Sequence, residues 1–395
     1  MKRVLILYGA YGGGHLSAAK TICKQIENQY KNEVDVFMVD CIEYINKYVN
    51  KVSTEAYKEL AKKVPWVWKH VYKSARNGPI SHISTTTNKL MSYKLNLLMK
   101  ELKPDLIIST HPFATQMCVI LKEKEKIDCK LATVLTDYHI HDQWLVLSKY
   151  NDYFFVSNEQ MKAAMIAEGI HDQKIYVTGI PVSDRFLIDY DKDKIYKHFE
   201  LSPDKKTVLF FAGGEFGLSP DKETILYFAG GEFGLGRNTT IMVLKVLIRL
   251  FKDLQIVAIS GKNKKMNKKF QELIDLTNSS DRVKLFEYTD KVPELMSISS
   301  AVITKAGGLT ITECLASNLP IIIINPIPGQ EEENAEFLEK NNVGVWIKKG
   351  DSIARTLKNL SRNQEKLSSM IENSKLLAKP KATEEICKIL MNEIL

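Results

Sequence analysis

A glycine-rich turn close to the N-terminus is the first place where residue types and spacing could do chemistry. Gly12–Gly14 and His15 follow the strand-like run 4–8 and open a helix expected over Leu16–Glu27. Glycines let the backbone approach a ligand closely, and a helix N-terminus favours negative charge. A neutral imidazole there could accept a proton from an attacking hydroxyl, although a packing or capping histidine is the competing interpretation.

Two polar turns in the second half of the chain suit a nucleotide and a sugar. In Thr304–Glu313, two glycines and a threonine precede a helix, which is typical of a diphosphate cradle; Glu313 could accept hydrogen bonds from ribose hydroxyls, or could be an ordinary solvated helix residue. In Pro326–Asn334, a run of Gln, Glu and Asn side chains could read sugar hydroxyls. The acidic run could equally complement a helix dipole.

These turns need elements to position them, and the chain supplies strand-like runs that alternate with segments long enough for crossover helices. That alternation predicts an α/β fold with two Rossmann-like, doubly wound domains. Strands are expected at 4–8, 34–39, 105–109, 131–135, 153–156, 175–178, 224–228, 255–259, 283–286, 301–304, 321–324 and 343–347. The predicted organisation is a first domain over 1–185, a linker over 186–206, a second domain over 207–380 and a helix over 381–395, which could fold back onto either domain.

A tandem duplication interrupts the start of the second domain. Leu201–Gly217 is repeated almost verbatim as Leu218–Gly234. Two parallel strands cannot be joined by the six-residue link 218–223, so only one copy can be the first strand of the sheet. We expect the second copy to be that strand, because it leads directly into the following helix.

Composition restricts the class of protein. With 45% hydrophobic and 26% charged residues, the 395-residue chain is neither disordered nor fibrous. No apolar run is long enough to span a membrane, no leader is predicted, and the six cysteines form no CxxC pair. A reducing cytoplasm is the expected location.

The net charge of +8 is unevenly distributed. Residues 57–103 carry ten basic residues against two acidic ones, with aromatic side chains interleaved. Such a stretch suits the surface of an anionic membrane, and a solvated helix with aromatics packed on the core is the alternative. Nucleic acid is not an expected partner, since no nucleic-acid motif accompanies the stretch. The proposed membrane contacts are Lys62, Lys63, Trp66, Trp68, Lys69 and Lys73.

At this point the residues resemble a known family. The pattern TKAGGLTxxE…LPIIIINPIPGQEEEN in Ile303–Asn334 is similar to the donor-binding half of the monogalactosyldiacylglycerol synthase and bacterial diacylglycerol glucosyltransferase family, which has the two-domain GT-B fold. GGGH at 12–15, PDLIISTHP at 104–112, the TD…H..W element at 136–144 and TGIPV at 178–182 resemble further family motifs. The resemblance covers nearly the whole chain, and the duplication is the clear departure.

The resemblance implies an inverting transfer of hexose from a UDP-sugar to diacylglycerol, with no cofactor and no essential bound metal, by a peripheral protein on the inner face of the cell membrane. Glucose is favoured and galactose is possible. His15 would be the general base, with Asp137 as its partner or substitute. Donor-binding residues would be Gly230, Gly231, Gly307, Gly308, Thr310, Glu313, Gln330, Glu331 and Asn334, and acceptor-side residues would be Gly12, Gly13, Gly14, His111, His141 and Trp144.

Other functions remain open on the residues alone. A lipid-linked N-acetylglucosaminyl transferase of cell-wall synthesis is a related enzyme class, and extracted lipid intermediates as acceptors would identify it. A non-catalytic UDP-sugar sensor is made more plausible by the duplicated loop, which could reduce activity. A dinucleotide-dependent oxidoreductase is disfavoured, because the first glycine turn departs from GxGxxG.

Overall fold

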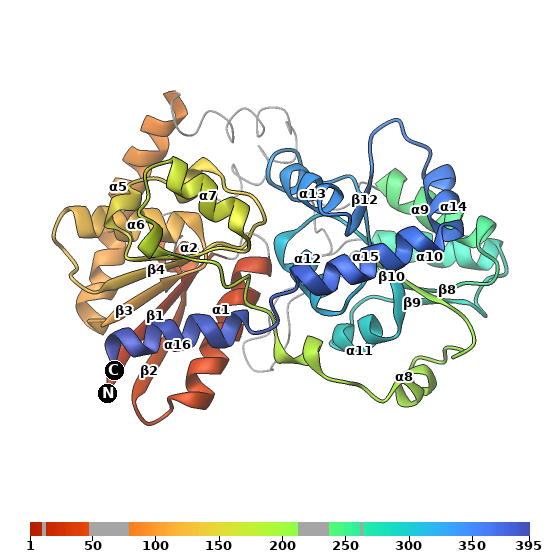
Figure 1. The fold of residues 1–395 in the computed structure, drawn as a ribbon, viewed down its shortest axis with the longest axis horizontal. Coiled ribbons are helices and arrows are strands. Elements are labelled where there is room, and N and C mark those ends of the chain that lie inside the picture. Colours follow the sequence, from red (N-terminus) through yellow and green to blue (C-terminus); the bar gives the residue numbers. More distant parts are fainter. Residues whose placement is uncertain (10–12, 47–78, 212–236, 261–263) are drawn as a thin grey trace. The chain divides into compact units, whose positions relative to one another are not determined.

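The computed structural model describes residues 1–9, 13–46, 79–211, 237–260 and 264–395. The chain divides into two compact units, each built around one parallel sheet (Figure 1). The first unit comprises Met1–Val182, Pro328–Gln330 and Lys379–Leu395, and the second comprises Ser183–Ile327 and Glu331–Ala378. Both sheets have the strand order of doubly wound α/β folds, so the predicted fold class is confirmed.

The sheet of the first unit has the order β2-β1-β3-β4-β5-β6, with every pairing parallel. The direction in which strands are added reverses between β1 and β3, and ligands of such sheets bind outside the carboxyl ends of the strands at that point. The strands are β1 (Lys2–Tyr8), β2 (Val34–Asp40), β3 (Leu106–Ser109), β4 (Lys130–Val134), β5 (Tyr153–Phe155) and β6 (Ile175–Tyr176).

Alternating side chains of this sheet enter two different cores, because successive residues of a strand point to opposite faces. Val4, Ile6 and Ile108 pack against α1 (Gly13–Gln29), whereas Leu5, Leu7 and Ile107 face the other side. The second core is covered by α2 (Cys41–Asn46), α5 (Pro79–Leu102) and α6 (Pro112–Glu123). A smaller cluster holds α7 (Glu159–Ala167) against β5.

A helix from the far end of the sequence completes the first core. In α16 (Ala382–Ile394), Ile386, Leu390 and Ile394 are buried among the side chains of β1, β3 and α1. The phenolic hydroxyl of Tyr153 donates to Glu393 Oε2 at 2.6 Å. Figure 1 shows α16 lying alongside α1, so this helix folds back onto the first unit.

The sheet of the second unit has the order β12-β11-β10-β7-β8-β9 and is also entirely parallel. Its direction reverses between β7 and β10, the classical place for a nucleotide in such a sheet. The strands are β7 (Thr207–Phe211), β8 (Gln255–Ile259), β9 (Val283–Phe286), β10 (Ser299–Thr304), β11 (Ile321–Ile324) and β12 (Gly344–Ile347).

The strand β7 corrects one expectation. It belongs to the first copy of the duplication, pairs with both β10 and β8, and is buried throughout, so the prediction that the second copy forms this strand was wrong. The first copy follows α8 (Lys192–His198) after a short link and therefore reaches the sheet first along the chain. Outside the duplication, every predicted strand is confirmed to within two residues. Residues 212–236, which include the whole second copy and the end of the first, lie outside the described residues.

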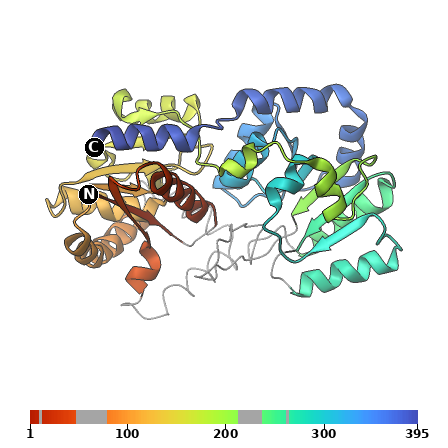
Figure 2. The same cartoon turned by 90° about the horizontal axis from the view of Figure 1, so that it is seen from below.

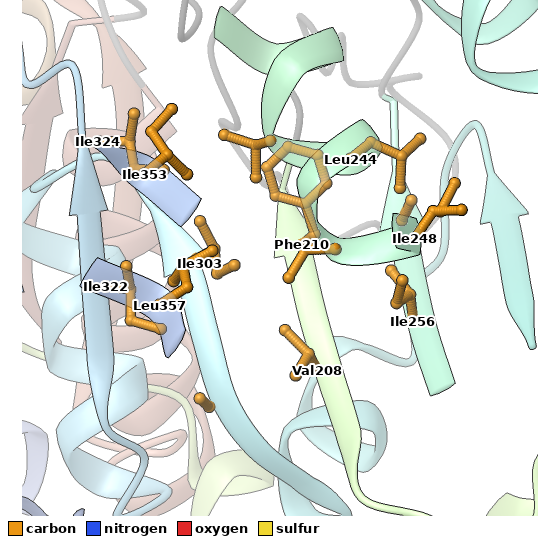
Figure 3. Packing of buried hydrophobic residues seen from close by; sticks show 14 of the residues in the cluster. Val208, Phe210, Leu244, Ile248, Ile256, Ile303, Ile322, Ile324, Ile353 and Leu357 are labelled. Carbon is orange, nitrogen blue, oxygen red and sulfur yellow. The ribbon is translucent and has the colours of Figure 1, made fainter. Parts of the chain in front are cut away.

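The sheet of the second unit is buried on both faces, and one large core lies between it and the helices on one face. Figure 3 shows Val208 and Phe210 of β7 beside Leu244 of α9, with Leu357 of α14 near the neighbouring strands. Besides α8, the α-helices described in this unit are α9 (Arg237–Leu250), α10 (Lys264–Leu276), α11 (Val292–Ser297), α12 (Gly308–Ala316), α13 (Gln330–Lys340), α14 (Ile353–Arg362) and α15 (Gln364–Leu377). The same layering is visible from below in Figure 2.

None of the described helices is long and apolar enough to cross a bilayer. The predicted membrane contacts, Lys62, Lys63, Trp66, Trp68, Lys69 and Lys73, all lie outside the described residues, so membrane contact through them stays a prediction.

Candidate active site

The loops that follow β1, β3 and β4 bring a group of predicted site residues together at the carboxyl edge of the first sheet. His15 lies in the first turn of α1, after β1. His111 is the N-cap of α6, after β3, and Asp137 follows β4. The short 3-10 helix η1 (Asp142–Trp144), with His141 as its N-cap, supplies the remaining members of the group.

His15 is held by contacts to its Nδ1 atom. The carbonyl oxygen of Thr110 lies 2.6 Å from Nδ1, and the hydroxyl oxygen of Thr136 lies 3.0 Å from the same atom. A carbonyl oxygen only accepts hydrogen bonds, so Nδ1 carries the proton in the neutral ring. The other nitrogen, Nε2, then keeps its lone pair, which is the form that a general base requires.

A second hydrogen bond of Thr110 links the first turn of α1 to the loop after β3. The Thr110 hydroxyl donates to the carbonyl oxygen of His15 at 2.9 Å, so Thr110 contacts both the side chain and the main chain of His15. This second bond ties the main chain of the first turn of α1 to that loop. The imidazole thus contacts the loop after β3, and the role of His15 as a general base stays a prediction.

Burial and neighbouring ionisable groups set the pKa of His15. Burial lowers the pKa of His15, and the Asp137 carboxylate opposes that shift by raising it. Burial alone would raise the pKa of Asp137, but His141 and His15 hold it below its ordinary value. The Asp137 carboxylate is 1% exposed overall and its Oδ2 lies 3.6 Å from His141 Nε2. At neutral pH the site thus combines a neutral His15 with an ionised Asp137.

His111 belongs to the same group of side chains and comes from the loop between β3 and α6. Its ring packs edge-to-face on His15, with 4.5 Å between the centroids, and its Nδ1 accepts a hydrogen bond from the amide of Phe113. Burial, followed by His15 and His141, lowers the pKa of His111 well below the ordinary value. A Cβ atom at Gly9 would lie 2.8 Å from the His111 ring, so glycine is required there.

Trp144 packs against two histidines of this group. The indole is 1% exposed, and its ring centroid lies 6.3 Å from that of His15 and 5.7 Å from that of His141. Within the described parts of the chain, its Nε1–H is buried without a hydrogen-bond partner. A buried indole donor normally finds an acceptor, so a ligand oxygen would be favourable here.

In the second unit, the turn after β10 carries the predicted diphosphate residues. Gly307 is the N-cap of α12, with φ −72° and ψ 135°, and Gly308 is the first helical residue. Gly307 has no side chain to cap the first-turn N–H groups, and a helix N-terminus of this kind attracts anions. A Cβ atom at Gly307 would meet only Thr310 Oγ1 and Glu331 Oε1, each at 4.0 Å, so one side of the turn is open.

Glu313 lies one turn further along α12 and is 2% exposed. This burial removes the alternative of an ordinary solvated helix residue. Its position on the helix that begins at Gly308 is compatible with the predicted contact to a ribose.

The predicted hexose-reading residues occupy the first turns of α13. Gln330 is the first residue of the helix and is half-buried. The two carboxylate oxygens of Glu331 have separate partners: Oε1 lies 3.2 Å from Lys305 Nζ, and Oε2 accepts the amide of Ile327 at 2.7 Å. Asn334 is fully buried and donates from Nδ2 to the carbonyl oxygen of Ala306 at 3.0 Å.

Three of the predicted donor-binding and acceptor-side residues have no described position. Gly12, Gly230 and Gly231 lie outside the described residues, whereas Gly13 and Gly14 begin α1. Over the same described ranges, no group of three or more His, Cys, Asp or Glu side chains is arranged to hold a metal ion.

Comparison with known proteins identifies the family. A protein of Staphylococcus saprophyticus, named processive diacylglycerol beta-glucosyltransferase, is 30% identical over 99% of this chain and 93% of its own length. The chain belongs to the monogalactosyldiacylglycerol synthase and diacylglycerol glucosyltransferase family. A relative of the same name from Bacillus licheniformis is 28% identical over 98% of this chain and 93% of its own length.

Two family models match this chain, one over the part that holds most of the first sheet and one over the part that holds most of the second. Residues 15–182 match the model described as monogalactosyldiacylglycerol (MGDG) synthase, and residues 237–386 match the glycosyltransferase family 28 C-terminal domain. The first match begins at His15, and the second contains the Gly307 turn and α13. The resemblance stated from the motifs is therefore confirmed.

Solved structures show that the family chain has the GT-B fold. Acinetobacter baumannii MurG is 13% identical with a TM-score of 0.63, covering 99% of this chain and 100% of its own. The co-structure of Staphylococcus aureus MnaA with UDP is 16% identical with a TM-score of 0.61, covering 99% of this chain and 97% of its own. At these identities the likeness establishes the fold alone.

Sequence reasoning missed three residues that this family member uses to build its site. Thr110 and Thr136 contact His15, and Lys305 pairs with Glu331. The threonines stand inside the STHP and TD motifs that were recognised, so their proximity to the strand ends was a usable signal. Nothing in the local sequence indicated the Lys305 pair, because its partner is 26 residues away.

Proposed function

We propose that the protein transfers glucose from UDP-glucose to the free hydroxyl of diacylglycerol, with inversion at the anomeric carbon. The relatives named processive diacylglycerol beta-glucosyltransferase support the acceptor and the sugar. A nucleotide-linked glucose is an α-glycoside, so a beta product is what inversion would give. UDP-galactose is the second candidate donor, since no described residue discriminates the hydroxyl that differs.

The observation that carries the mechanism is the orientation of His15. Thr110 holds the proton on Nδ1, so Nε2 is free to accept the proton of the acceptor hydroxyl. The resulting oxygen attacks the anomeric carbon while the bond from that carbon to the UDP oxygen breaks. One carbon–oxygen bond forms and one breaks, the proton passes to His15, and UDP leaves with its negative charge.

Asp137 would stabilise the imidazolium that forms on His15. It raises the pKa of His15 against the effect of burial, and it lies in the same buried group of side chains. His111, His141 and Trp144 would line the acceptor side, together with Gly13 and Gly14 at the start of α1. The buried indole N–H of Trp144 would donate to an oxygen of the acceptor.

The donor would bind to the second unit. First-turn N–H groups of α12 would stabilise the charge that develops on the leaving diphosphate, with Gly307, Gly308 and Thr310 in contact with it. Glu313 would accept hydrogen bonds from the ribose, and Gln330, Glu331 and Asn334 would border the hexose. We propose that no bound metal is needed, because the helix N-terminus supplies the positive potential.

We propose a peripheral location on the inner face of the cell membrane, where diacylglycerol is available as acceptor. The excess of basic residues over 57–103 supports attraction to anionic lipid.

The decisive experiment is a transfer assay with radiolabelled UDP-glucose and, in parallel, UDP-galactose on mixed micelles of diacylglycerol and anionic lipid. We expect a labelled glycolipid from UDP-glucose, no effect of a metal chelator, and a loss of about 10²- to 10⁴-fold in rate for His15→Ala. The matched control is His171→Ala, which removes an exposed histidine far along the chain and should retain full activity.

Two results would contradict the proposal. Absence of a glycolipid with either donor while UDP still binds would favour a UDP-sugar sensor. Transfer that survives His15→Ala undiminished would exclude His15 as the base.

A further inference from the structure

Two neighbouring turns of the second unit are joined by a buried pair of opposite charges. Lys305 lies in the turn after β10, and Glu331 lies in the first turn of α13, after β11. Their side chains are 11% and 12% exposed, and Nζ lies 3.2 Å from Oε1. An ion pair this well buried has little water to replace either partner, so loss of one leaves an uncompensated charge.

The carboxylate of Glu331 does more than hold the lysine. Its Oε2 accepts the amide of Ile327 at 2.7 Å, in the turn that leads from β11 to α13. Its Oε1 faces Gly307, whose Cβ position would lie 4.0 Å away. One side chain thus contacts both turns at the carboxyl ends of two paired strands.

A second bond joins the same turns. Asn334, one helical turn beyond Glu331, is fully buried and donates from Nδ2 to the carbonyl oxygen of Ala306. Ala306 directly precedes Gly307, the N-cap of α12. Residues of α13 therefore hold the two positions that precede Gly307, through Glu331 to Lys305 and through Asn334 to Ala306. Such rigid support is what a preorganised anion site requires.

We propose that Lys305 is a further residue of the donor site, whose ammonium attracts the diphosphate, and that Glu331 is a positioning residue that sets this lysine and the Gly307 turn. The inference rests on the proposed function, because it takes the diphosphate of a UDP-sugar as the ligand. It assigns Glu331 a role that differs from reading hexose hydroxyls. Without Lys305, the Glu331 carboxylate would repel a diphosphate at the turn.

The two roles predict different ligand selectivity. A residue that reads the hexose should affect binding of UDP-glucose and leave binding of UDP unchanged. A residue that positions the diphosphate turn should affect both ligands by the same factor, because both carry the diphosphate. Isothermal titration calorimetry with UDP and with UDP-glucose, at one fixed salt concentration, measures this directly.

For Lys305→Met we expect both affinities to fall by roughly 10- to 100-fold, the usual effect of a lost charged contact. For Glu331→Gln we expect the affinities for UDP and for UDP-glucose to change by the same factor. The double variant Lys305→Met/Glu331→Gln should bind UDP more tightly than Lys305→Met alone, because the uncompensated carboxylate is gone. The matched control is Lys348→Met. It breaks an exposed ion pair with Glu339, which lies in α13 like Glu331, at 3.3 Å, and the variant should bind both ligands normally.

The inference is overturned if Lys305→Met binds UDP like the wild type, or if Glu331→Gln loses UDP-glucose affinity while keeping that for UDP. It is also overturned if the double variant is no better than Lys305→Met. Should Lys305→Met fail to fold, the ratio between the UDP and UDP-glucose affinities of Glu331→Gln still decides. A wild-type protein that binds UDP but forms no glycolipid would contradict the proposed function and leave this assignment standing, so the two failures are distinguishable.

Discussion

His15 carries the first prediction at the residue scale, because its proton affinity sets the acid limit of activity. Burial lowers the pKa of His15, and only the neutral ring can act as a base. We expect kcat/KM to fall as the pH drops through a value below 6.5, with a plateau above it. In Asp137→Asn the carboxylate that raises the pKa is gone, so the acid limb should move to still lower pH, with activity on the plateau reduced about tenfold.

The measurement is the pH profile of kcat/KM for the acceptor, for the wild type and for Asp137→Asn. Glu159→Gln provides the control, since it removes an exposed carboxylate of α7. An acid limb that moves to higher pH in Asp137→Asn, or stays where it was, would show that Asp137 does not act on His15.

Gly307 carries the second prediction at this scale. Its φ of −72° is available to any residue, and a Cβ would meet its nearest atoms at 4.0 Å, so Gly307→Ala should fold normally. We expect an unfolding free energy within about 1 kcal/mol of the wild type. The added methyl group would nevertheless occupy the open side of the turn, where the diphosphate would approach, so UDP affinity should fall at least tenfold.

Gly344→Ala is the opposite case and a matched control. Its Cβ would lie 2.9 Å from Leu338 Cβ, so the variant should lose stability while the folded fraction binds UDP normally. Chemical denaturation and UDP titration together separate the two patterns. Unchanged UDP affinity in Gly307→Ala would argue against a diphosphate at this turn.

At the scale of elements, the packing of α16 makes a prediction about stability. Leu390 is fully buried in the core shared with β1, β3 and α1. Leu390→Ala should lower the unfolding free energy of the first unit by about 2–5 kcal/mol, because it leaves a cavity. Lys388→Ala, an exposed change on the same helix, should have almost no effect.

Urea denaturation followed by fluorescence tests this prediction, with Trp144 as a reporter in the first unit. The two units can unfold separately, so the transition of the first unit is the one to compare. Equal transitions for Leu390→Ala and Lys388→Ala would contradict the described packing of α16.

Elements were predicted well where the local pattern was unique, and poorly where it was repeated. The runs at 255–259 and 321–324 are buried on both faces and read as continuous apolar segments, so their strands were correctly expected. The two copies at 201–234 have almost identical sequences. No local preference could choose between them, and the choice depends on the tertiary pairing of β7 with β10 and β8.

The candidate site shows the same division. His15, His111 and Asp137 lie together in the structure, because each follows a strand of one parallel sheet and such ends meet at one edge. Their proximity could be anticipated from the sequence, and their roles stay predictions. The tautomer of His15 could not be predicted, because it depends on a carbonyl oxygen 95 residues away. The contact of Lys305 with Glu331 likewise arises from the adjacency of β10 and β11.

At the scale of the whole molecule, the uneven charge predicts salt-sensitive binding to anionic membranes. Replacing Lys62, Lys63, Lys69 and Lys73 by glutamine should weaken binding to vesicles that contain anionic lipid, since each lysine near the surface contributes about 1 kcal/mol. Added salt should reduce the difference between wild type and variant. Vesicle co-sedimentation at two salt concentrations measures both effects.

The control removes the same number of charges elsewhere. Lys264, Lys265, Lys268 and Lys269 are exposed on α10, and their replacement by glutamine lowers the net charge equally. If both quadruple variants bind alike, membrane attraction depends on net charge and the stretch 57–103 has no special role.

The return of α16 to the first unit has a consequence for synthesis on the ribosome. The first core includes Ile386, Leu390 and Ile394, which are translated only after the whole span 183–378. At about 5–20 residues per second this delay is roughly 10–40 s. During that time the nascent first unit exposes the apolar residues that α16 later covers, and it should recruit chaperones. Crosslinking of chaperones to nascent chains on ribosomes stalled before and after α16 has emerged measures this.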